Sequence, residues 1–387
     1  MKPLHTAILF ILLNHVPFTA MRLAASLYAL HLGAGPAAVG AMVALFSALP
    51  MLGSVYLGRL IDRRGVRAPL LVAAAVLTLA SLLAVLWPSV PVLFCVTALG
   101  GGAYITILIA GQQLIGRYGG ARARVSNFSS LSTAFALSLA AVPMVTGFLI
   151  EHIGFTATFA IMTVTPPLSI LLIVFDKLAD LGPVSGAAFA SGERKAQAAG
   201  AMDLMRNRSL FQLYAFSILF TVSWDLFLFM TPIYGTQLHL PASQIGIVVG
   251  SFSVAMFVVR LGAKPMAARF TSRQLLLLCL SGAGLGALGF SFAANMPLLV
   301  LCAVIMGLGQ GLANPTMNAL LYDASPPERI AEAMGLRTSI AKACQVVLPL
   351  MAGSASVAFG AAPIFWLIAL LQLGAATLAR GQWHART

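Results

Sequence analysis

The chain has 387 residues, of which 60% are hydrophobic and 9% are charged, and its mean hydropathy is +0.95. No soluble core could bury that much apolar surface, so the composition excludes a soluble globular protein and predicts an integral membrane protein. The net charge of +13 is spread over many short loops rather than gathered in one segment, which argues against nucleic acid as a partner.

Apolar stretches long enough to cross about 30 Å of hydrocarbon recur along the whole chain. In chain order they span residues 6–30, 37–58, 68–88, 91–114, 127–150, 155–175, 210–234, 243–263, 273–293, 297–321, 335–357 and 361–379. These twelve stretches predict an all-α membrane protein with twelve transmembrane helices in the lipid bilayer, and they leave almost no residues for a soluble domain.

The loops between these stretches alternate in charge. Lys and Arg follow the even-numbered stretches and occur at both termini, whereas the opposite loops, such as "HLGAGPAA" and "YGTQLHLPAS", contain neither. By the positive-inside rule both termini are cytoplasmic, and we expect a multi-pass protein of the bacterial inner membrane. The first stretch has a signal-like "FTA", but its length and its place in a repeat predict that it is retained.

A shift of 206 residues superposes the second part of the chain on the first. It brings Tyr28 onto Tyr234, Arg63 onto Arg269, Gly101 onto Gly307, Pro143 onto Pro349, Gly154 onto Gly360 and Phe159 onto Phe365. One unbroken offset predicts two six-helix bundles, residues 1–175 and 210–387, joined by a small, polar and charged cytoplasmic linker at residues 176–209. Parallel halves of this kind rock about a site near the membrane midplane, which gives alternating access.

The loop after the second stretch reads "GRLIDRRGVR". Its pattern Gly-x-x-x-Asp-Arg-x-Gly-x-Arg, at Gly58, Asp62, Arg63, Gly65 and Arg67, resembles motif A of the major facilitator superfamily, and with the repeat the whole chain resembles the bacterial twelve-helix efflux-type members. The resemblance implies a loop that latches the cytoplasmic side of the outward-facing state. Physically, Gly58 would let helices approach closely, Gly65 would permit a tight turn and Asp62 would hold basic groups or a helix N-terminus. The alternative is that these arginines only anchor the topology.

Other motifs of this family are incomplete. Motif C of helix 5 survives only as "VPMVTG", with Pro143 and Gly147 in place. The arginine of motif B in helix 4 is missing, and helix 1 lacks an embedded carboxylate. These departures weaken a direct transfer of mechanism from the drug antiporters.

Arg22 lies inside the first stretch, where a guanidinium costs about 2.5 kcal/mol or more unless something offsets it. At 1.5 Å per residue it lies roughly 6 Å to the periplasmic side of its midpoint, and Asp225 lies about 4 to 5 Å to the same side in the seventh stretch. We therefore expect a charge pair between the halves that closes the periplasmic gate and that substrate or a proton on Asp225 breaks. The alternatives are that Arg22 snorkels or packs within its own half, and that Asp225 pairs locally.

In the family, helices 1, 4, 7 and 10 line the central cavity, so polar and aromatic residues there are further candidates. Beyond the pair above, the candidates for the substrate and proton pathway are Asn14, His15, Tyr104, Trp224, Gln310, Asn314, Asn318, Lys342 and Gln345. His15 could exchange protons or be a packing residue. The two aromatic residues could stack a planar ligand or face lipid.

The spacing of the remaining candidates adds detail. Gln310, Asn314 and Asn318 recur every four residues and predict one polar stripe on helix 10, for binding or for helix packing. Lys342, one turn before Gln345, could bind an anionic group or snorkel. Arg260, near the cytoplasmic end of its stretch, is expected to snorkel to that surface.

Two cations, Arg22 and Lys342, against one acid, Asp225, favour an anionic or zwitterionic organic solute. We expect a monomeric secondary transporter that exports this solute, with the proton gradient as driving force and no bound cofactor. The alternatives are proton-coupled symport uptake of a carboxylate-bearing compound, broad-specificity drug efflux, and a non-transporting sensor with the same fold. No nucleophile and base pair or phosphate loop occurs, and the four cysteines stand singly, so neither an enzyme nor a metal site is expected.

Overall fold

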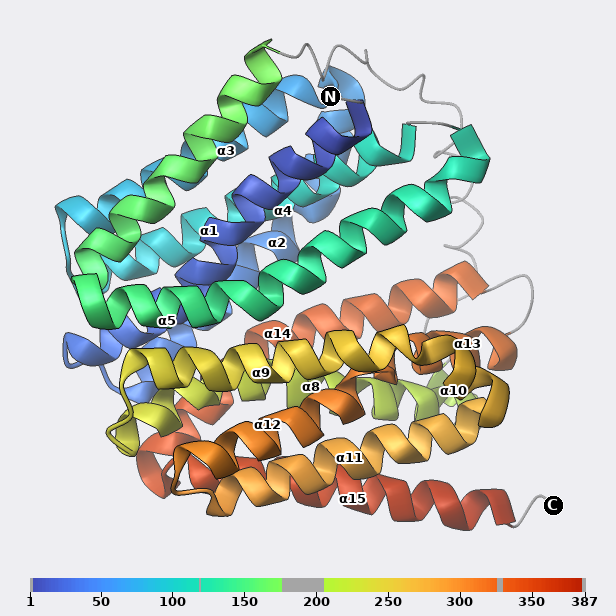
Figure 1. The fold of residues 1–387 in the computed structure, drawn as a ribbon. Helices are drawn as coiled ribbons and strands as arrows, with labels where there is room; N and C mark the ends of the chain where they lie inside the picture. The colour runs from blue at the N-terminus through green and yellow to red at the C-terminus, as the bar shows by residue number, and fades with distance from the viewer. Residues whose placement is uncertain (1–2, 118–119, 176–204, 326–329, 385–387) are drawn as a thin grey trace. The chain divides into compact units, whose positions relative to one another are not determined.

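The computed structural model describes residues 3–117, 120–175, 205–325 and 330–384. Every regular element in these residues is an α-helix, which confirms the expected class for this part of the chain (Figure 1). In chain order the helices are α1 (Pro3–His31), α2 (Pro36–Arg64), α3 (Arg67–Leu86), α4 (Val90–Arg117), α5 (Gly120–Phe175), α8 (Arg208–Gln237), α9 (Ala242–Leu261), α10 (Ala263–Arg269), α11 (Ser272–Phe292), α12 (Met296–Gly311), α13 (Ala313–Ala324), α14 (Ile330–Phe359) and α15 (Ala362–His384).

Within the described ranges, 11 helical segments are long and apolar enough to cross a membrane. The longest, Ser130–Phe175, has 46 residues and covers most of the expected stretch 127–150 and all of the stretch 155–175. Inside it Gly154 has φ 82° and ψ 172°, values outside the helical region, so the helix is interrupted there. Large apolar side chains cover much of the helices' exterior: Leu52 is 76% exposed and Phe359 is 74% exposed. Such a surface suits contact with lipid tails rather than with water.

The tenth expected stretch departs from a single helix. Two helices, α12 and α13, replace the continuous helix predicted over residues 297–321, and they meet at Leu312. Pro315 is the physical reason, since proline has no N–H for the carbonyl four residues earlier and its ring crowds that carbonyl.

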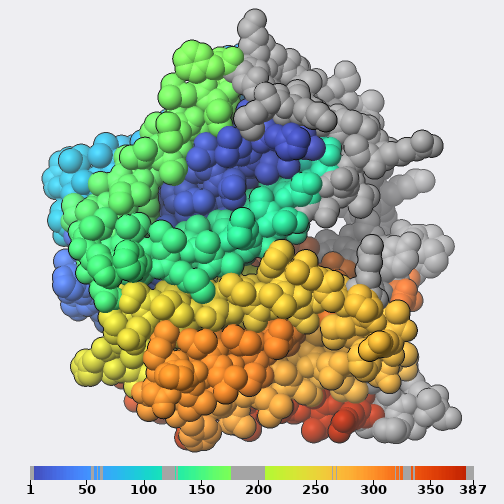
Figure 2. Space-filling view, in the orientation of Figure 1, coloured from blue at the N-terminus to red at the C-terminus, as the bar shows by residue number. Residues whose placement is uncertain are grey.

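The chain divides into two compact units. Unit 1 comprises Met1–Gly186 with Gly235–Gly250, and unit 2 comprises Ala187–Tyr234 with Ser251–Thr387. In unit 1, α1 packs along α5 and α4, and the blue side chains of α1 lie directly against the green ones of α5 (Figure 2). The expected linker at 176–209 lies largely outside the described residues, so its boundaries stay a prediction.

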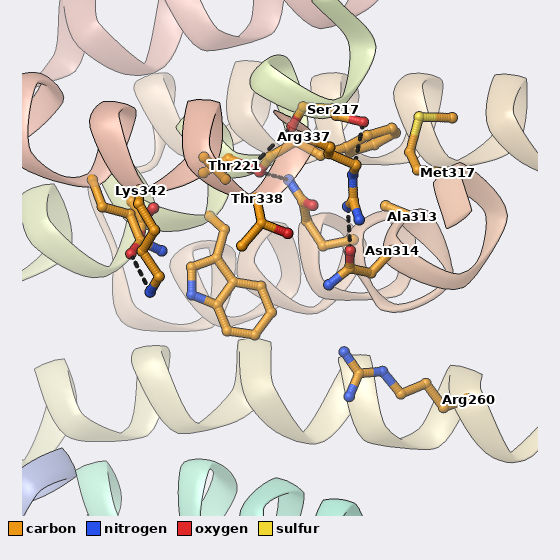
Figure 3. A pocket seen from close by; sticks show the side chains of 15 residues that line it. Ser217, Thr221, Arg260, Ala313, Asn314, Met317, Arg337, Thr338 and Lys342 are labelled. Carbon is orange, nitrogen blue, oxygen red and sulfur yellow. Dashed lines mark hydrogen bonds between the residues drawn. The ribbon is translucent and has the colours of Figure 1, made fainter. Parts of the chain in front are cut away.

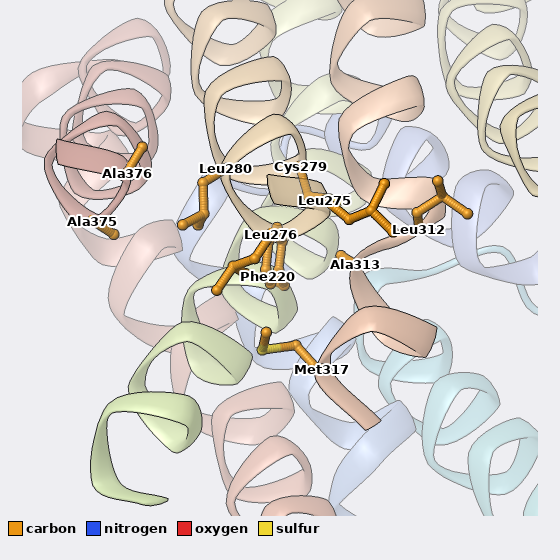
Figure 4. Close-up of a cluster of buried hydrophobic side chains, with 10 residues drawn as sticks. All are labelled: Phe220, Leu275, Leu276, Cys279, Leu280, Leu312, Ala313, Met317, Ala375 and Ala376. Atoms are coloured by element: carbon orange, nitrogen blue, oxygen red, sulfur yellow. The ribbon is translucent and has the colours of Figure 1, made fainter. Parts of the chain in front are cut away.

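The core of unit 2 is built around α11, which packs against α12 on one side and α15 on the other. Leu276 and Leu280 of α11 are fully buried in a cluster with Phe220 of α8 and Ala376 of α15 (Figure 4). These elements hold α8, α12 and α13 in place, and the polar faces of those helices line the cavity described below.

The internal repeat is visible in the backbone. Gly154 and Gly360, which the shift of 206 residues superposes, have φ values of 82° and 78°. The same shift superposes Gly33, with φ 83°, on His239, with φ 56°. Left-handed values of φ are uncommon for residues other than glycine, so their recurrence at equivalent positions shows that both copies turn in the same way.

Helix contacts repeat as well. A Cβ atom on Gly101 of α4 would collide with the carbonyl oxygen of Phe46 in α2, and a Cβ atom on Gly307 of α12 would collide with that of Phe252 in α9. All four positions are related by the shift of 206 residues. In both copies the missing side chain therefore lets two helix backbones approach closely.

Candidate functional site

Unit 2 contains a cavity of about 320 Å³ among α8, α9, α12, α13 and α14 (Figure 3). Its charged lining residues are Asp225 on α8, Arg260 on α9, and Arg337 and Lys342 on α14. The polar and aromatic lining residues are Ser217, Phe220, Thr221, Trp224, Gln310, Asn314, Thr338 and Gln345. Three cationic side chains against one carboxylate make this cavity electropositive, as expected from the sequence. Two of the three, Arg260 and Arg337, were not among the cavity residues that the sequence predicted.

Arg337 donates three hydrogen bonds to side chains around the cavity. Its Nε donates to Ser217 Oγ at 3.0 Å and its Nη2 donates to Asn314 Oδ1 (Figure 3). Its Nη1 donates to Asn318 Oδ1 at 2.6 Å. All of these acceptors are neutral oxygens. The guanidinium is thus oriented by α8 and α13, while none of these three partners neutralises its charge.

The sequence contained a signal for Arg337 that its position obscured. Arg337 is the third residue of the expected stretch 335–357, where a cation is usually taken as a topology anchor. It is spaced by four residues from Ala341 and by eight from Gln345, and all three line the cavity. That helical spacing places them on one face of α14.

Lys342 and Gln345 are adjacent on α14, and Lys342 Nζ donates to Gln345 Oε1 at 3.0 Å. Both side chains line the cavity, which favours the binding interpretation of Lys342 over snorkelling.

The structure shows a contact of Arg260 that the sequence did not predict, while its expected snorkelling to the cytoplasmic surface stays a prediction. Its side chain lines the cavity, and its Nε donates to the carbonyl oxygen of Gly311 at 3.1 Å. Estimating depth from a straight helix missed this contact, because the acceptor exists only where α12 ends.

The polar stripe of helix 10 is interrupted at Leu312. Gln310, on α12, still lines the cavity together with Asn314, on α13, and its Nε2 donates to the Phe220 carbonyl at 3.4 Å. Asn318 reaches the site indirectly, as an acceptor for Arg337.

Asp225 and Trp224 lie side by side on α8 and line the same cavity. Asp225 is buried, with 5% of its surface exposed, and a carboxylate at that depth is costly unless charged or polar groups surround it. The Trp224 ring meets Phe252 edge to face, with centroids 5.8 Å apart.

The candidates in the first stretch form a separate polar cluster in unit 1. His15 is buried, with its Nδ1 2.8 Å from Ser138 Oγ and 3.3 Å from Thr19 Oγ1. Asn14 Nδ2 donates to Ser169 Oγ at 2.8 Å. Both side chains therefore help to tie α1 to α5, as the packing interpretation of His15 proposed.

Tyr104 of α4 stacks on Phe18, with ring centroids 3.9 Å apart, so one face of the tyrosine ring is already covered. Arg22 is half-buried in α1, and its carbonyl oxygen accepts from Ser26 Oγ at 2.9 Å. Arg22 belongs to unit 1 and Asp225 to unit 2, so the proposed pair of charges stays a prediction.

One of the two glycines of the motif A loop, Gly65, makes the tight turn that the sequence predicted. Gly65 ends α2 with φ 79°, a conformation that favours glycine and makes the turn into α3, where Arg67 is the first residue. A Cβ atom on Gly58 would meet none of the described atoms within 4 Å, so the part of the chain that the structure describes gives no support to the close helix approach expected there, which stays a prediction. The side chains of Asp62 and Arg63 lie outside the described residues, and the latch stays a prediction.

The motif C remnant lies at a tight helix crossing within unit 1. A Cβ atom on Gly147 would collide with the Ala242 carbonyl oxygen, and one on Gly246 would collide with the Pro143 carbonyl oxygen. Glu151 adds a polar contact at the same crossing, where its Oε2 accepts from the Ser243 backbone N–H at 3.1 Å, in the first turn of α9. The remnant therefore provides close backbone packing between α5 and the start of α9.

Membrane-crossing helices in two repeated copies, with a polar cavity lined by charged side chains, define a multi-pass membrane transporter for a small molecule. The chain belongs to the Major Facilitator Superfamily, whose family model matches residues 7–242 and 213–381. This membership confirms the family resemblance seen in the sequence.

Curated relatives match over shorter segments. The chain is 30% identical over 100 residues to the uncharacterized MFS-type transporter YcnB of Bacillus subtilis, a match that covers 26% of this chain and 21% of that protein. It is 24% identical over 134 residues to the quinolone resistance protein NorA of Staphylococcus aureus, a match that covers 35% of this chain and 34% of that protein. The chain therefore aligns with only about a fifth to a third of these relatives' lengths.

Solved structures match over nearly the whole chain. The nucleoside transporter NupG has a TM-score of 0.78 at 13% identity and covers 99% of both chains. The peptide transporter POT in complex with sulfate has a TM-score of 0.77 at 15% identity, covering 98% of this chain and 94% of that chain. A POT family transporter in complex with 5-aminolevulinic acid has a TM-score of 0.77 at 12% identity, covering 97% and 94%. At these identities the likeness shows the fold alone. Membership of the Major Facilitator Superfamily makes the chain a transporter rather than an enzyme.

Proposed function

We propose that this protein is a proton-coupled secondary transporter that exports a small anionic or zwitterionic organic solute across the bacterial inner membrane. The observation that carries the proposal is the cavity of unit 2, in which Arg260, Arg337 and Lys342 accompany the single carboxylate of Asp225. An excess of cationic groups in a site of low dielectric attracts a carboxylate or similar anion and repels a cation. Asp225 is the proton-accepting group of this proposal.

In this proposal the protein crosses the membrane twelve times, with Ser130–Phe175 divided into two spans at Gly154 and with both termini in the cytoplasm. The charged loops support this arrangement through the positive-inside rule. The halves 1–175 and 210–387 rock about the linker at 176–209, and one monomer is the working unit. The motif A loop latches the cytoplasmic side of the outward-facing state.

The substrate class is tested by thermal unfolding of the detergent-purified protein in the presence of succinate, glutamate, glucosamine and glycerol. A ligand at about a hundred times its dissociation constant stabilises the native state by about 2.7 kcal/mol. We expect succinate or glutamate to raise the melting temperature and the cation and the neutral solute to leave it unchanged. Stabilisation by the cation alone would contradict the proposed substrate class.

Broad-specificity drug efflux is the second candidate, because the chain is similar to a quinolone resistance protein over 134 residues. Export rather than uptake is favoured for the same reason, and by the motif A loop. A lipophilic cation such as ethidium, tested in the same unfolding assay, distinguishes this candidate from an anion transporter.

The proposed gate between Arg22 and Asp225 has its own test. Arg22→Asp and Asp225→Arg should each reduce transport at least about tenfold, since each leaves two like charges at similar depth in the membrane. The doubly reversed variant should recover part of the activity, because it restores an attractive pair. Transport in the double variant no better than in either single variant would show that the two residues do not act together.

A further inference from the structure

The break between α12 and α13 leaves the backbone carbonyl of Gly311 without its helical donor. In a continuous helix the carbonyl of Gly311 would accept from the N–H of residue 315, but residue 315 is a proline and has no N–H. The ladder resumes one residue later, where the Thr316 N–H donates to the Leu312 carbonyl at 3.0 Å. The Gly311 carbonyl is therefore the acceptor that the break exposes.

Arg260 occupies the place of the missing donor. Its Nε donates to the Gly311 carbonyl oxygen at 3.1 Å. The approach is possible because Gly311 has no side chain: a Cβ atom there would collide with the Val259 side chain and crowd the Met256 carbonyl. A backbone carbonyl without a hydrogen-bond donor is costly inside a membrane protein, so this bond stabilises the break.

The other side of the break is held by a second arginine. Asn314, in the first turn of α13, and Asn318 accept from Arg337 of α14. The end of α12 is thus held by the guanidinium of Arg260 and the start of α13 by that of Arg337, and both arginines line the same cavity (Figure 3). Because the bond to Gly311 uses Nε, the terminal nitrogens of Arg260 remain directed toward the interior of the cavity (Figure 3).

We infer that Arg260 is a positioning residue that replaces the hydrogen bond Pro315 cannot make, and that an anion in the cavity acts on the bend of helix 10 through this arginine. The second part rests on the proposed function, since it requires an anionic solute. An anion that binds the terminal nitrogens of Arg260 competes for the orientation of the guanidinium, and the position of α13 relative to α12 then depends on cavity occupancy.

A double-mutant cycle without any ligand tests the first part alone. Arg260→Ala in the wild-type background should lower the melting temperature by about 2 to 4 °C, because a charged hydrogen bond is lost. In the Pro315→Ala background the restored N–H at position 315 can donate to Gly311, so Arg260→Ala should cost less than half as much. Arg380→Ala removes the same charge from an exposed position of α15 and should leave the melting temperature unchanged.

Equal losses in the two backgrounds would overturn the inference, because they would show that Arg260 does not act through the Gly311 carbonyl. If Arg260→Ala alone fails to fold, folding of the variant that also has Pro315→Ala supports the inference, and failure of both overturns it.

Arg260→Gln separates the two roles of the residue. The amide N–H can still donate to the Gly311 carbonyl but has no charge for an anion, so the unliganded melting temperature should stay within about 1 °C of wild type. The apparent affinity for succinate or glutamate, measured from the concentration dependence of the melting temperature, should fall at least about tenfold. An unchanged affinity in Arg260→Gln would overturn the coupling between the anion and the bend. If no anion raises the melting temperature of the wild-type protein, the proposed function is contradicted, and the double-mutant cycle alone decides the role of Arg260 at the break.

Discussion

Arg337→Ala should weaken the binding of succinate or glutamate by at least about thirtyfold, the equivalent of about 2 kcal/mol. Arg337 donates three hydrogen bonds in the cavity, and their acceptors, Ser217, Asn318 and Asn314, are all neutral. An entering carboxylate can exchange with the amide oxygens and form a charge-assisted bond that is roughly twice as strong as a neutral one. The affinity is measured by isothermal titration or by the concentration dependence of the melting temperature.

Two controls define this result. Arg380→Ala, on the exposed face of α15, removes one positive charge without touching the cavity and should keep the affinity of the wild type. Arg337→Lys keeps the charge but loses the planar fork that bonds two oxygens at once, so it should bind with intermediate affinity. If Arg337→Ala binds the anion as tightly as the wild type does, Arg337 does not contact the substrate, and the main support for an anionic substrate is lost.

Gly307→Val should destabilise the protein by about 3 kcal/mol or more and should abolish transport. A Cβ atom at this position would collide with the backbone carbonyl of Phe252, which cannot rotate away as a side chain could. Separating α12 from α9 also separates Gly311 from Arg260, so the site is disturbed together with the core. Overpacking of a tight contact costs about 1 to 3 kcal/mol when neighbours can adjust, and more when they cannot.

Gly374→Val on α15 is the matched control for this change. A Cβ atom at Gly374 would meet nothing within 4 Å, and the residue is exposed. The change should therefore be neutral to within about 1 kcal/mol, since valine and glycine differ in helix propensity by only a few tenths of a kcal/mol. Thermal unfolding compares the two variants, and an equal loss of stability in both would show that the crossing at Gly307 is not closely packed.

The fold could be predicted from the sequence because both of its signals, the apolar stretches and the internal repeat, extend over many residues. The offset of 206 residues predicted equivalent positions, and Gly101 with Gly307 and Gly154 with Gly360 take equivalent roles in the structure. A repeat survives only where both copies meet the same packing requirement, so matched small residues are a reliable signal of helix crossings.

The site could be predicted only in part, because its geometry depends on where helices break. Lys342, Gln345, Asp225, Trp224, Gln310 and Asn314 line one cavity as the sequence suggested. Arg260 and Arg337 were missed because both lie near the ends of expected stretches, where cations usually anchor topology. Their roles depend on partners from other helices, the Gly311 carbonyl and the amides of α13, and no local pattern in the sequence shows such partners.

The structure also corrects an argument based on residue type alone. Gly58 was expected to permit a close helix approach, but no described atom lies within 4 Å of where its Cβ would be, whereas Gly65 in the same loop makes the expected turn with φ 79°. A glycine in a motif can thus be required for its backbone or for its lack of a side chain, and only its surroundings distinguish the two.

Proton movement in reconstituted vesicles is the measurement that tests the central claim most directly. The protein is incorporated into liposomes that contain a pH-sensitive dye, succinate or glutamate is added outside, and protein-free liposomes and the Asp225→Asn variant serve as controls. The account predicts that solute entry drives protons out, so the interior becomes more alkaline in wild-type vesicles but not in either control. Acidification of the interior would contradict export by antiport and indicate symport, and an unchanged interior pH with every anionic and zwitterionic solute would contradict proton-coupled transport through this cavity.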